Sequence, residues 1–219
     1  MAEKRVNLFK ILINRPIVVY LLLGLIAWQA VDYKKMREGL ETRLVGSIPI
    51  DYFQPLVSSQ DNNQELPPEL LADYIYYFGK ITEFFPNQGD GYALLGYSYY
   101  RSGNLARARR AYRRAGGRNP KVFWNHYNVA ILDYESRDFQ ACVGNIDKAL
   151  ASDPEKTMMI LSESKLVYQI LWRNMTSLSD QYFSMRLRKG FSNAYQLREI
   201  CQKKEYQDLK TLGIHVQIF

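Results

Sequence analysis

The side chains with the greatest chemical capacity in this sequence are arginines and tyrosines that gather in one stretch, YALLGYSYYRSGNLARARRAYRRAGGRNP, between residues 92 and 120. An arginine guanidinium binds carboxylate and phosphate groups through paired hydrogen bonds, and a tyrosine offers a large rigid contact surface with a polar tip. Both residue types are typical of binding surfaces. The arginines of interest are Arg107, Arg109, Arg110, Arg113, Arg114 and Arg118.

Residue types that carry catalysis or hold metal ions are scarce. The chain has two histidines, His126 and His215, and two cysteines, Cys142 and Cys201, with no Cys-x-x-Cys pair. It has no glycine-rich phosphate loop, no nucleophile elbow and no histidine paired with a plausible nucleophile. We therefore predict no catalytic residue, no metal site, no cofactor and no enzymatic activity. The cysteine count excludes a disulfide framework and leaves one bridge between the two cysteines open.

The composition indicates a folded, basic chain. Of 219 residues, 47% are apolar, which is enough for a packed core. Lysines and arginines number 29 against 22 aspartates and glutamates, giving a net charge of +7. This charge permits nucleic acid, anionic lipid headgroups or an acidic protein as partners, and it does not choose among them.

An apolar segment near the amino terminus predicts a membrane helix. The fifteen residues from Ile17 to Val31, IVVYLLLGLIAWQAV, contain one strongly polar side chain, Gln29. Residues 16–33 reach the ~17–25 residues that span a bilayer. A cleaved signal peptide would need a small residue where Trp28 stands, and a core helix would show a polar stripe at helical spacing. We favour a single-pass anchor over these two alternatives.

The flanks of this segment indicate an orientation. Residues 1–15 form a short basic head, and such a head before an early apolar segment is typical of a signal anchor that exports the rest of the chain. Lysines and arginines number four on each side of the segment, so their balance alone does not decide the orientation. We expect the amino terminus in the cytoplasm and the soluble domain on the far side of the membrane, which is the periplasm in a bacterium.

Residues 34–68 are predicted to form a spacer between the membrane and the domain. Four prolines and the polar run SSQDNNQ argue against a long regular element there. The part from Ile48 to Leu56, IPIDYFQPL, is too apolar for a free linker. We expect it to pack on the domain or on a partner.

A regular period organises the middle of the chain. Pro86, Pro120 and Pro154 are equally spaced. Each interval would hold two helices. Small residues at two recurring positions would let these helices approach closely, and the proline would stop the second one. The first interval has Tyr92, Leu95, Gly96, Tyr99, Ala108, Tyr112, Ala115 and Pro120, and one period later come His126, Val129, Ala130, Asp133, Cys142, Ile146, Ala149 and Pro154.

The first interval resembles the tetratricopeptide repeat (TPR), which is about 34 residues long and has the pattern W-x₂-L-G-x₂-Y, then A-x₃-F, then P. The resemblance implies an all-α fold, a TPR-type solenoid of helical hairpins, here with an amino-terminal single-pass transmembrane helix. The repeat region would be 69–156, with a half repeat at 69–86 and repeats at 89–120 and 123–154. The second repeat departs from the pattern at His126 and Asp133.

Residues 157–219 are predicted to add helices that complete the solenoid and shield its end. Apolar residues at helical spacing indicate a first helix over roughly 157–172. Two further helices are expected over roughly 180–189 and 194–209.

The resemblance also implies where partners bind. In this family the first helices of successive repeats line a concave groove that holds an extended peptide or a helix of another protein. Large aromatic side chains there would supply binding energy at low entropy cost. The alternative is that the segment IPIDYFQPL or the carboxy-terminal tail fills the groove. The groove positions here are Tyr97, Tyr100, Arg101, Trp124, Tyr127, Ile131, Tyr134 and Glu135.

The six arginines would lie on the second helix of the first repeat, where Ala108, Tyr112 and Ala115 take the inward face. They would then form a basic face on the convex side. This face could meet anionic lipid or an acidic protein, or it could be a solvated surface without a partner. Nucleic acid is not expected, because an exported domain would rarely meet it and no nucleic-acid-binding motif is present.

Together these features predict a membrane-anchored protein–protein interaction module. We expect a scaffolding or assembly subunit of a larger membrane complex that binds other protein subunits through its aromatic-lined groove and the bilayer through residues 16–33. The alternative is an anchored receptor that transiently captures translocating polypeptides.

Overall fold

The computed structural model describes residues 52–62, 65–163 and 179–218. The chain divides into two units, Met1–Ile48 and Pro49–Phe219, and the described residues belong to the second. The predicted basic head, the membrane helix at 16–33 and most of the spacer lie outside the described residues. Within those residues, no helix has both the length and the apolar character needed to cross a bilayer.

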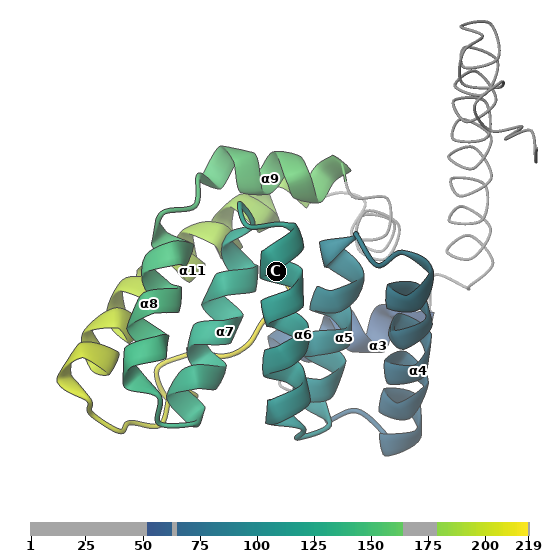
Figure 1. Cartoon of the computed structure of the whole chain (residues 1–219), viewed down its shortest axis with the longest axis horizontal. Helices are drawn as coiled ribbons and strands as arrows, with labels where there is room; N and C mark the ends of the chain where they lie inside the picture. Colours follow the sequence, from purple (N-terminus) through teal and green to yellow (C-terminus); the bar gives the residue numbers. More distant parts are fainter. Residues whose placement is uncertain (1–51, 63–64, 164–178, 219) are drawn as a thin grey trace, which may run out of the picture. The chain divides into compact units, whose positions relative to one another are not determined.

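All regular structure in the described part of the chain is helical, with no strand (Figure 1), which confirms the all-α class there. The helices are α3 (Gln54–Asn62), α4 (Pro68–Phe84), α5 (Gly89–Arg101), α6 (Leu105–Arg118), α7 (Phe123–Glu135), α8 (Phe139–Leu150), α9 (Pro154–Glu163) and α11 (Ser179–Lys203).

Two helical hairpins, α5–α6 and α7–α8, repeat one design with the period of the sequence. Helices α5 and α7 begin at residues 89 and 123, and α6 and α8 begin at 105 and 139. The side chain of Asn104 accepts a hydrogen bond from a backbone N–H in the first turn of α6, and Asp138 does the same for α8, both at 3.1 Å. The residue before each cap has a positive φ, 77° at Gly103 and 59° at Arg137. The period of the sequence is therefore a period of the structure.

Small side chains let the helices of each hairpin approach closely. Gly96 lies against Tyr112, and a Cβ atom there would come within 2.9 Å of the ring. Ala108 faces the same interface, while Ala130 and Cys142 take the matching positions of the second hairpin, and all three are fully buried. A larger side chain at any of them would push the helices apart, which explains why small residues recur with the period.

Helix α4 corresponds to the predicted half repeat. Pro68 lies at its start, where a missing N–H leaves no hydrogen bond unmade. The helix packs beside α5 and buries one stripe at helical spacing. That stripe consists of Leu71, Tyr74, Phe78 and Ile81.

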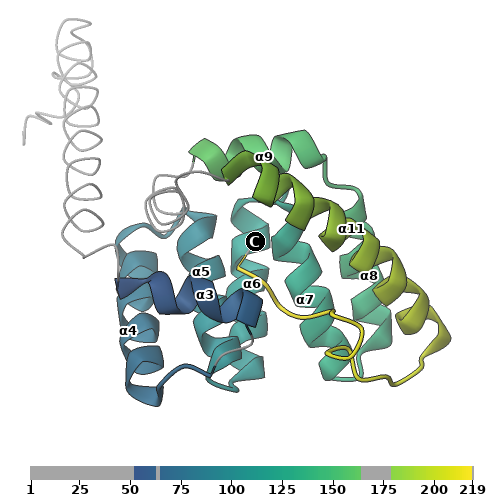
Figure 2. The same ribbon diagram turned by 180° about the vertical axis from the view of Figure 1, so that it is seen from behind.

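Helix α3 forms inside the predicted spacer and packs on the domain. Pro55 lies in its first turn, where proline is tolerated, so the prolines do not prevent a short helix. Phe53 and Leu56 are buried, and the Phe53 ring stacks on those of Tyr74 and Phe78 at centroid distances of 5.9 and 5.6 Å. Figure 2 shows α3 lying across α4 and α5. Of the expected apolar segment IPIDYFQPL, residues 52–56 lie against the domain, and residues 48–51 lie outside the described residues.

The carboxy-terminal helices differ from the prediction. Helix α9 covers the beginning of the first expected helix, and the remainder lies outside the described residues. The two helices expected at 180–189 and 194–209 are one continuous helix, α11, which ends at Lys203, so the expected helical residues 204–209 are not part of a helix. The expected break near Gly190 is wrong because this glycine allows close packing: a Cβ there would lie 2.4 Å from the Trp124 ring and 2.9 Å from Phe123.

A disulfide between Cys142 and Cys201 joins α8 to α11 across 59 positions of sequence. Both cysteines are buried, and their Cα atoms lie 6.3 Å apart. The sequence left this bridge open, and the structure forms it. The disulfide fixes the end of α11, after which the chain turns back as a non-helical tail.

Candidate functional site

The carboxy-terminal tail, defined as residues 204–218, lies over α7 on the same side as α3 and α11 (Figure 2). Its first part is held by Tyr134 of α7. The Tyr134 hydroxyl lies 3.2 and 2.9 Å from the carbonyl oxygens of Glu205 and Gln207, and it accepts a hydrogen bond of 2.6 Å from the Gln207 N–H. The Tyr206 ring stacks on the Tyr134 ring at 5.8 Å between centroids.

The last part of the tail is held by Asn128, also from α7. Its Nδ2 donates to the Gln217 carbonyl at 2.6 Å, and its Oδ1 accepts from the Gln217 N–H at 3.0 Å. The Tyr112 hydroxyl donates to the same carbonyl at 3.1 Å. Because Asn128 is fully buried, water cannot replace these bonds. Ile214 and Val216 of the tail are buried as well.

Helices α3 and α11 cover the tail from its other side. Gln60 of α3 accepts a hydrogen bond of 2.7 Å from the Ile218 N–H. Arg186 of α11 donates to the side-chain oxygens of Gln60 and Gln217 at 3.3 and 3.1 Å, and Asn193 of α11 donates to the Gly213 carbonyl at 3.1 Å. The tail is therefore enclosed between α7 and these two helices.

Most of the predicted groove positions are interior residues. Tyr97, Trp124, Tyr127, Ile131 and Tyr134 are at most 3% exposed, because α3, α11 and the tail cover them. They do not form an open surface in this structure. Their burial agrees with the alternative in which the chain's own segments fill the groove. Tyr100, Arg101 and Glu135 remain partly or largely exposed.

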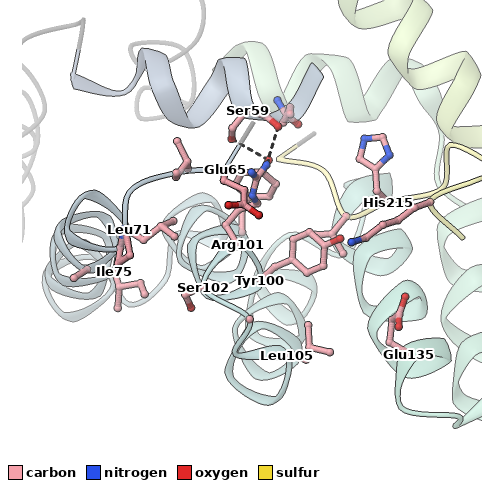
Figure 3. Close-up of a pocket in the computed structure, with 18 residues that line it drawn as sticks. Ser59, Glu65, Leu71, Ile75, Tyr100, Arg101, Ser102, Leu105, Glu135 and His215 are labelled. Atoms are coloured by element: carbon pink, nitrogen blue, oxygen red, sulfur yellow. Dashed lines mark hydrogen bonds between the residues drawn. The ribbon is translucent and has the colours of Figure 1, made fainter. Parts of the chain in front are cut away.

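One cleft remains open beside the tail (Figure 3). It has a volume of about 730 Å³, and Tyr97, Tyr100, Arg101 and Glu135 are among the residues that line it. Another wall comes from the residues just before α4, from α4 itself and from the start of α6. That wall is largely apolar and consists of Leu66, Leu71, Ala72, Ile75 and Leu105.

The charged side chains that line the cleft are balanced in sign. Arg101 and Lys210 are its cations, Glu65 and Glu135 are its carboxylates, and His215 lines it as well. The Arg101 guanidinium donates to the Ser59 carbonyl at 2.7 Å and to the Tyr97 hydroxyl at 3.2 Å, which fixes α3 against α5. Burial raises the pKa of Glu135, with Asp208 adding to this effect and Lys210 opposing it. Burial, then the charge of Glu135, raises the pKa of Tyr100.

The sequence did not indicate the apolar wall of this cleft. Residues 69–86 were expected only as a half repeat, although Leu71 and Ile75 have the i, i+4 spacing of neighbours on one helix face. Leu71 and Ile75 line the cleft across from Tyr100 because α3 and the tail leave their part of α4 uncovered.

The arginines of α6 separate into two groups. Arg109 and Arg113 form ion pairs with Asp133 at 3.2 and 3.0 Å, and Asn145 donates to the other carboxylate oxygen at 2.7 Å. The Asp133 side chain is completely buried. This departure from the repeat pattern is therefore a buried carboxylate with three hydrogen-bond donors. Burial raises its pKa, and Arg113, Asn145 and Arg109 oppose that rise.

The second group forms the arginine ridge, defined as Arg107, Arg110, Arg114 and Arg118, and all four are exposed. Arg107 lies over the ring of Tyr99, with its guanidinium carbon 5.7 Å from the centroid. Arg114 and Arg118 lie over the ring of Tyr92 at 6.0 and 4.3 Å. Three of the predicted basic positions are thus held on tyrosine faces.

Neither a metal site within the described residues nor a match to a known protein adds to this picture. Among the residues that the structure describes, no three His, Cys, Asp or Glu side chains gather closely enough to hold a metal ion. No protein-family model matches the sequence, and no match was found among curated proteins or solved structures.

Proposed function

We propose that this protein is a membrane-anchored protein–protein interaction module, a scaffolding or assembly subunit of a larger membrane complex. Its described domain would be a short TPR-type solenoid, and residues 16–33 would anchor it in the bilayer. The observation that carries the proposal is the open cleft between α4 and the tail. The sequence period, repeated in the helix starts and caps of α5–α6 and α7–α8, supports the solenoid.

The composition of the cleft suits a polypeptide. Its volume of about 730 Å³ lies within the ~300–1,000 Å³ typical of ligand sites. One wall offers apolar contacts, and charged side chains of both signs also line the cleft. Together they match the mixed side chains and backbone groups of a protein segment. The bonds from Arg101 to α3 hold the cleft in shape, so binding would cost little ordering of the site.

The disulfide supports the proposed orientation. Disulfides form and persist in oxidising compartments, and they are rare where the cytosol keeps thiols reduced. The bridge between Cys142 and Cys201 is buried and joins two helices of the core. We therefore propose that the amino terminus is in the cytoplasm and the domain on the far side of the membrane, which would be the periplasm in a bacterium.

Co-purification tests this function. The full chain, extracted from native membranes in mild detergent, should retain one or more partner proteins in fixed stoichiometry, and mass spectrometry identifies them. Leu105 lines the cleft, is 36% exposed and begins α6, where a carboxylate is favoured by the helix dipole. Leu105→Glu should therefore release the partner without unfolding the chain.

A matched variant controls for surface charge. Tyr195 on α11 is 63% exposed and does not line the cleft, so Tyr195→Glu should retain the partner. If Leu105→Glu retained it equally well, the cleft would not be the binding site. A chain that came away without stoichiometric partners would instead fit the alternative, an anchored receptor that captures polypeptides transiently.

A further inference from the structure

The arginine ridge carries positive charge that the structure leaves uncompensated. Helix α6 contains no acidic residue, and the buried carboxylate of Asp133 pairs with Arg109 and Arg113. Within the described residues, none of the four ridge arginines forms an ion pair. Arg107 and Arg118 are eleven positions apart on one helix, which at 1.5 Å per residue is about 16 Å. The ridge is therefore a row of four cations along a single helix face.

Three of the four ridge arginines have side-chain contacts within the domain. The Arg118 guanidinium donates to the Pro86 carbonyl and, at 3.2 Å, to the Arg114 carbonyl. Arg118 and Arg114 share the ring of Tyr92, and Arg107 uses that of Tyr99. Carbonyl and ring contacts orient a guanidinium without neutralising it, so the charge stays available while less rotamer entropy is lost on binding.

We propose that the arginine ridge binds the phosphate groups of anionic phospholipid headgroups. A planar guanidinium matches a phosphate with two parallel hydrogen bonds, and a row of cations near an anionic bilayer gains attraction from each member. The inference rests on the membrane anchor of the proposed function, which keeps the ridge within reach of lipid.

A lipid surface fits the ridge better than the other anionic partners. Protein interfaces depend on a buried apolar or aromatic centre, but Tyr92 is already buried beneath the arginines and offers no such centre. Nucleic acid is rarely met in the oxidising compartments where a disulfide such as Cys142–Cys201 persists. Binding to anionic headgroups requires a surface that attracts its ligand through positive charge, without an apolar centre.

Vesicle flotation tests the proposal with the full chain. The protein is placed in nanodiscs of neutral phosphatidylcholine, so that its own anchor is occupied, and mixed with vesicles. These contain either phosphatidylcholine alone or phosphatidylcholine and phosphatidylglycerol in a ratio of about two to one. We expect the anionic vesicles to carry the nanodiscs upward in a density gradient, and the neutral vesicles to leave them behind. Failure to enter nanodiscs would count against the anchor, and so against the proposed function, rather than against the ridge.

Two variants with the same charge change separate the ridge from net charge. The ridge variant replaces Arg107, Arg110, Arg114 and Arg118 by glutamine, which keeps helix propensity. The control variant makes the same change at four exposed cations elsewhere, Lys148, Arg188, Lys189 and Lys204. Each cation near an anionic surface contributes roughly a fivefold factor in binding, so the ridge variant should lose at least about a hundredfold of its capture and the control variant much less.

Two results would overturn the proposal: no capture of the unaltered chain by anionic vesicles, or an equal loss in both variants. The first result would point to an acidic protein or to no partner, and the second to net charge alone. Should the fourfold ridge variant fail to fold, Arg110→Gln/Arg114→Gln leaves the contacts of the Arg118 side chain in place and should lower capture by about tenfold.

Discussion

Asp133 shows how one residue can depart from a repeat pattern without loss of packing. Tyr99 takes the matching position one period earlier, and here a buried carboxylate accepts hydrogen bonds from Arg109, Arg113 and Asn145. The two arginines are partly exposed, so they can reach water if the carboxylate is removed. The cost of its removal should therefore lie below that of breaking a wholly buried pair.

We expect Asp133→Ala to lower the free energy of unfolding by about 2–3 kcal/mol, since it leaves three donors without their acceptor and opens a small cavity. Urea denaturation at pH 7 measures this change. Asp147→Ala breaks an ion pair with Arg198 in which both side chains are more than 40% exposed, and it should cost no more than about 0.5 kcal/mol. Equal costs for the two variants would contradict the role of burial.

His126 should make the stability of the domain depend on pH. Burial lowers its pKa below the ordinary value of 6.5, Lys148 adds to the fall, and a hydrogen bond with the Pro120 carbonyl opposes it. The unfolded chain therefore takes up this proton at a higher pH than the folded protein does. Its contribution to stability is complete above pH 6.5 and is lost as the pH falls through the lower pKa of the folded protein.

The prediction is that His126→Gln unfolds with a weaker pH dependence than the unaltered chain between pH 7 and pH 5. Urea denaturation across this range gives the free energy of unfolding for both proteins. The difference between them isolates His126, because carboxyl groups such as Glu135 titrate in both. A difference that stayed constant with pH would show that His126 titrates normally.

Among the elements, the tail decides what the domain leaves exposed. The helical hairpins could be predicted, because proline, small residues and aromatics recur at one fixed spacing. The tail could not, because a non-helical segment buried on several sides has no helical period and its partners are far away in sequence: Asn128 holds Gln217 across 89 positions. The candidate groove residues could therefore be predicted from the sequence, but which of them the chain itself covers could not.

Gly190 illustrates the same limit within one helix. A glycine between two amphipathic stretches usually indicates a break, but here it lets α11 pass close to Trp124. Packing against the neighbouring helix decides between these two outcomes, and the local sequence around Gly190 does not indicate that packing.

The hydrogen bonds of the tail predict a graded loss of stability. Tyr112→Phe removes one donor to the Gln217 carbonyl and should cost about 1 kcal/mol. Asn128→Ala removes a donor and an acceptor from the same buried peptide unit and should cost about 2–3 kcal/mol. Hydrogen exchange at Gln217 and Ile218 should rise far more in Asn128→Ala than in Tyr112→Phe. If exchange in the tail were already fast in the unaltered chain, the tail would not be a fixed part of the domain.

At the scale of the whole molecule, the disulfide ties the last helix and its tail to the second hairpin. Closing a loop of 59 residues should stabilise the folded protein by about 4 kcal/mol in the chain-entropy account. Cys142→Ser/Cys201→Ser should therefore lower the free energy of unfolding by roughly this amount in urea denaturation. Chain isolated from native membranes should carry no free thiol, and a fully reduced pair would contradict the proposed exported location.

The central claim is that a membrane-anchored chain holds a partner protein in the cleft between α4 and the tail. Site-specific photocrosslinking in native membranes tests it most directly, with a photoreactive amino acid at position 105 in the cleft and, for comparison, at position 195 on α11. We expect the chain in the membrane fraction, and we expect position 105 to give one discrete adduct with another protein while position 195 gives none. A chain in the soluble fraction, or the same adducts from both positions, would contradict it.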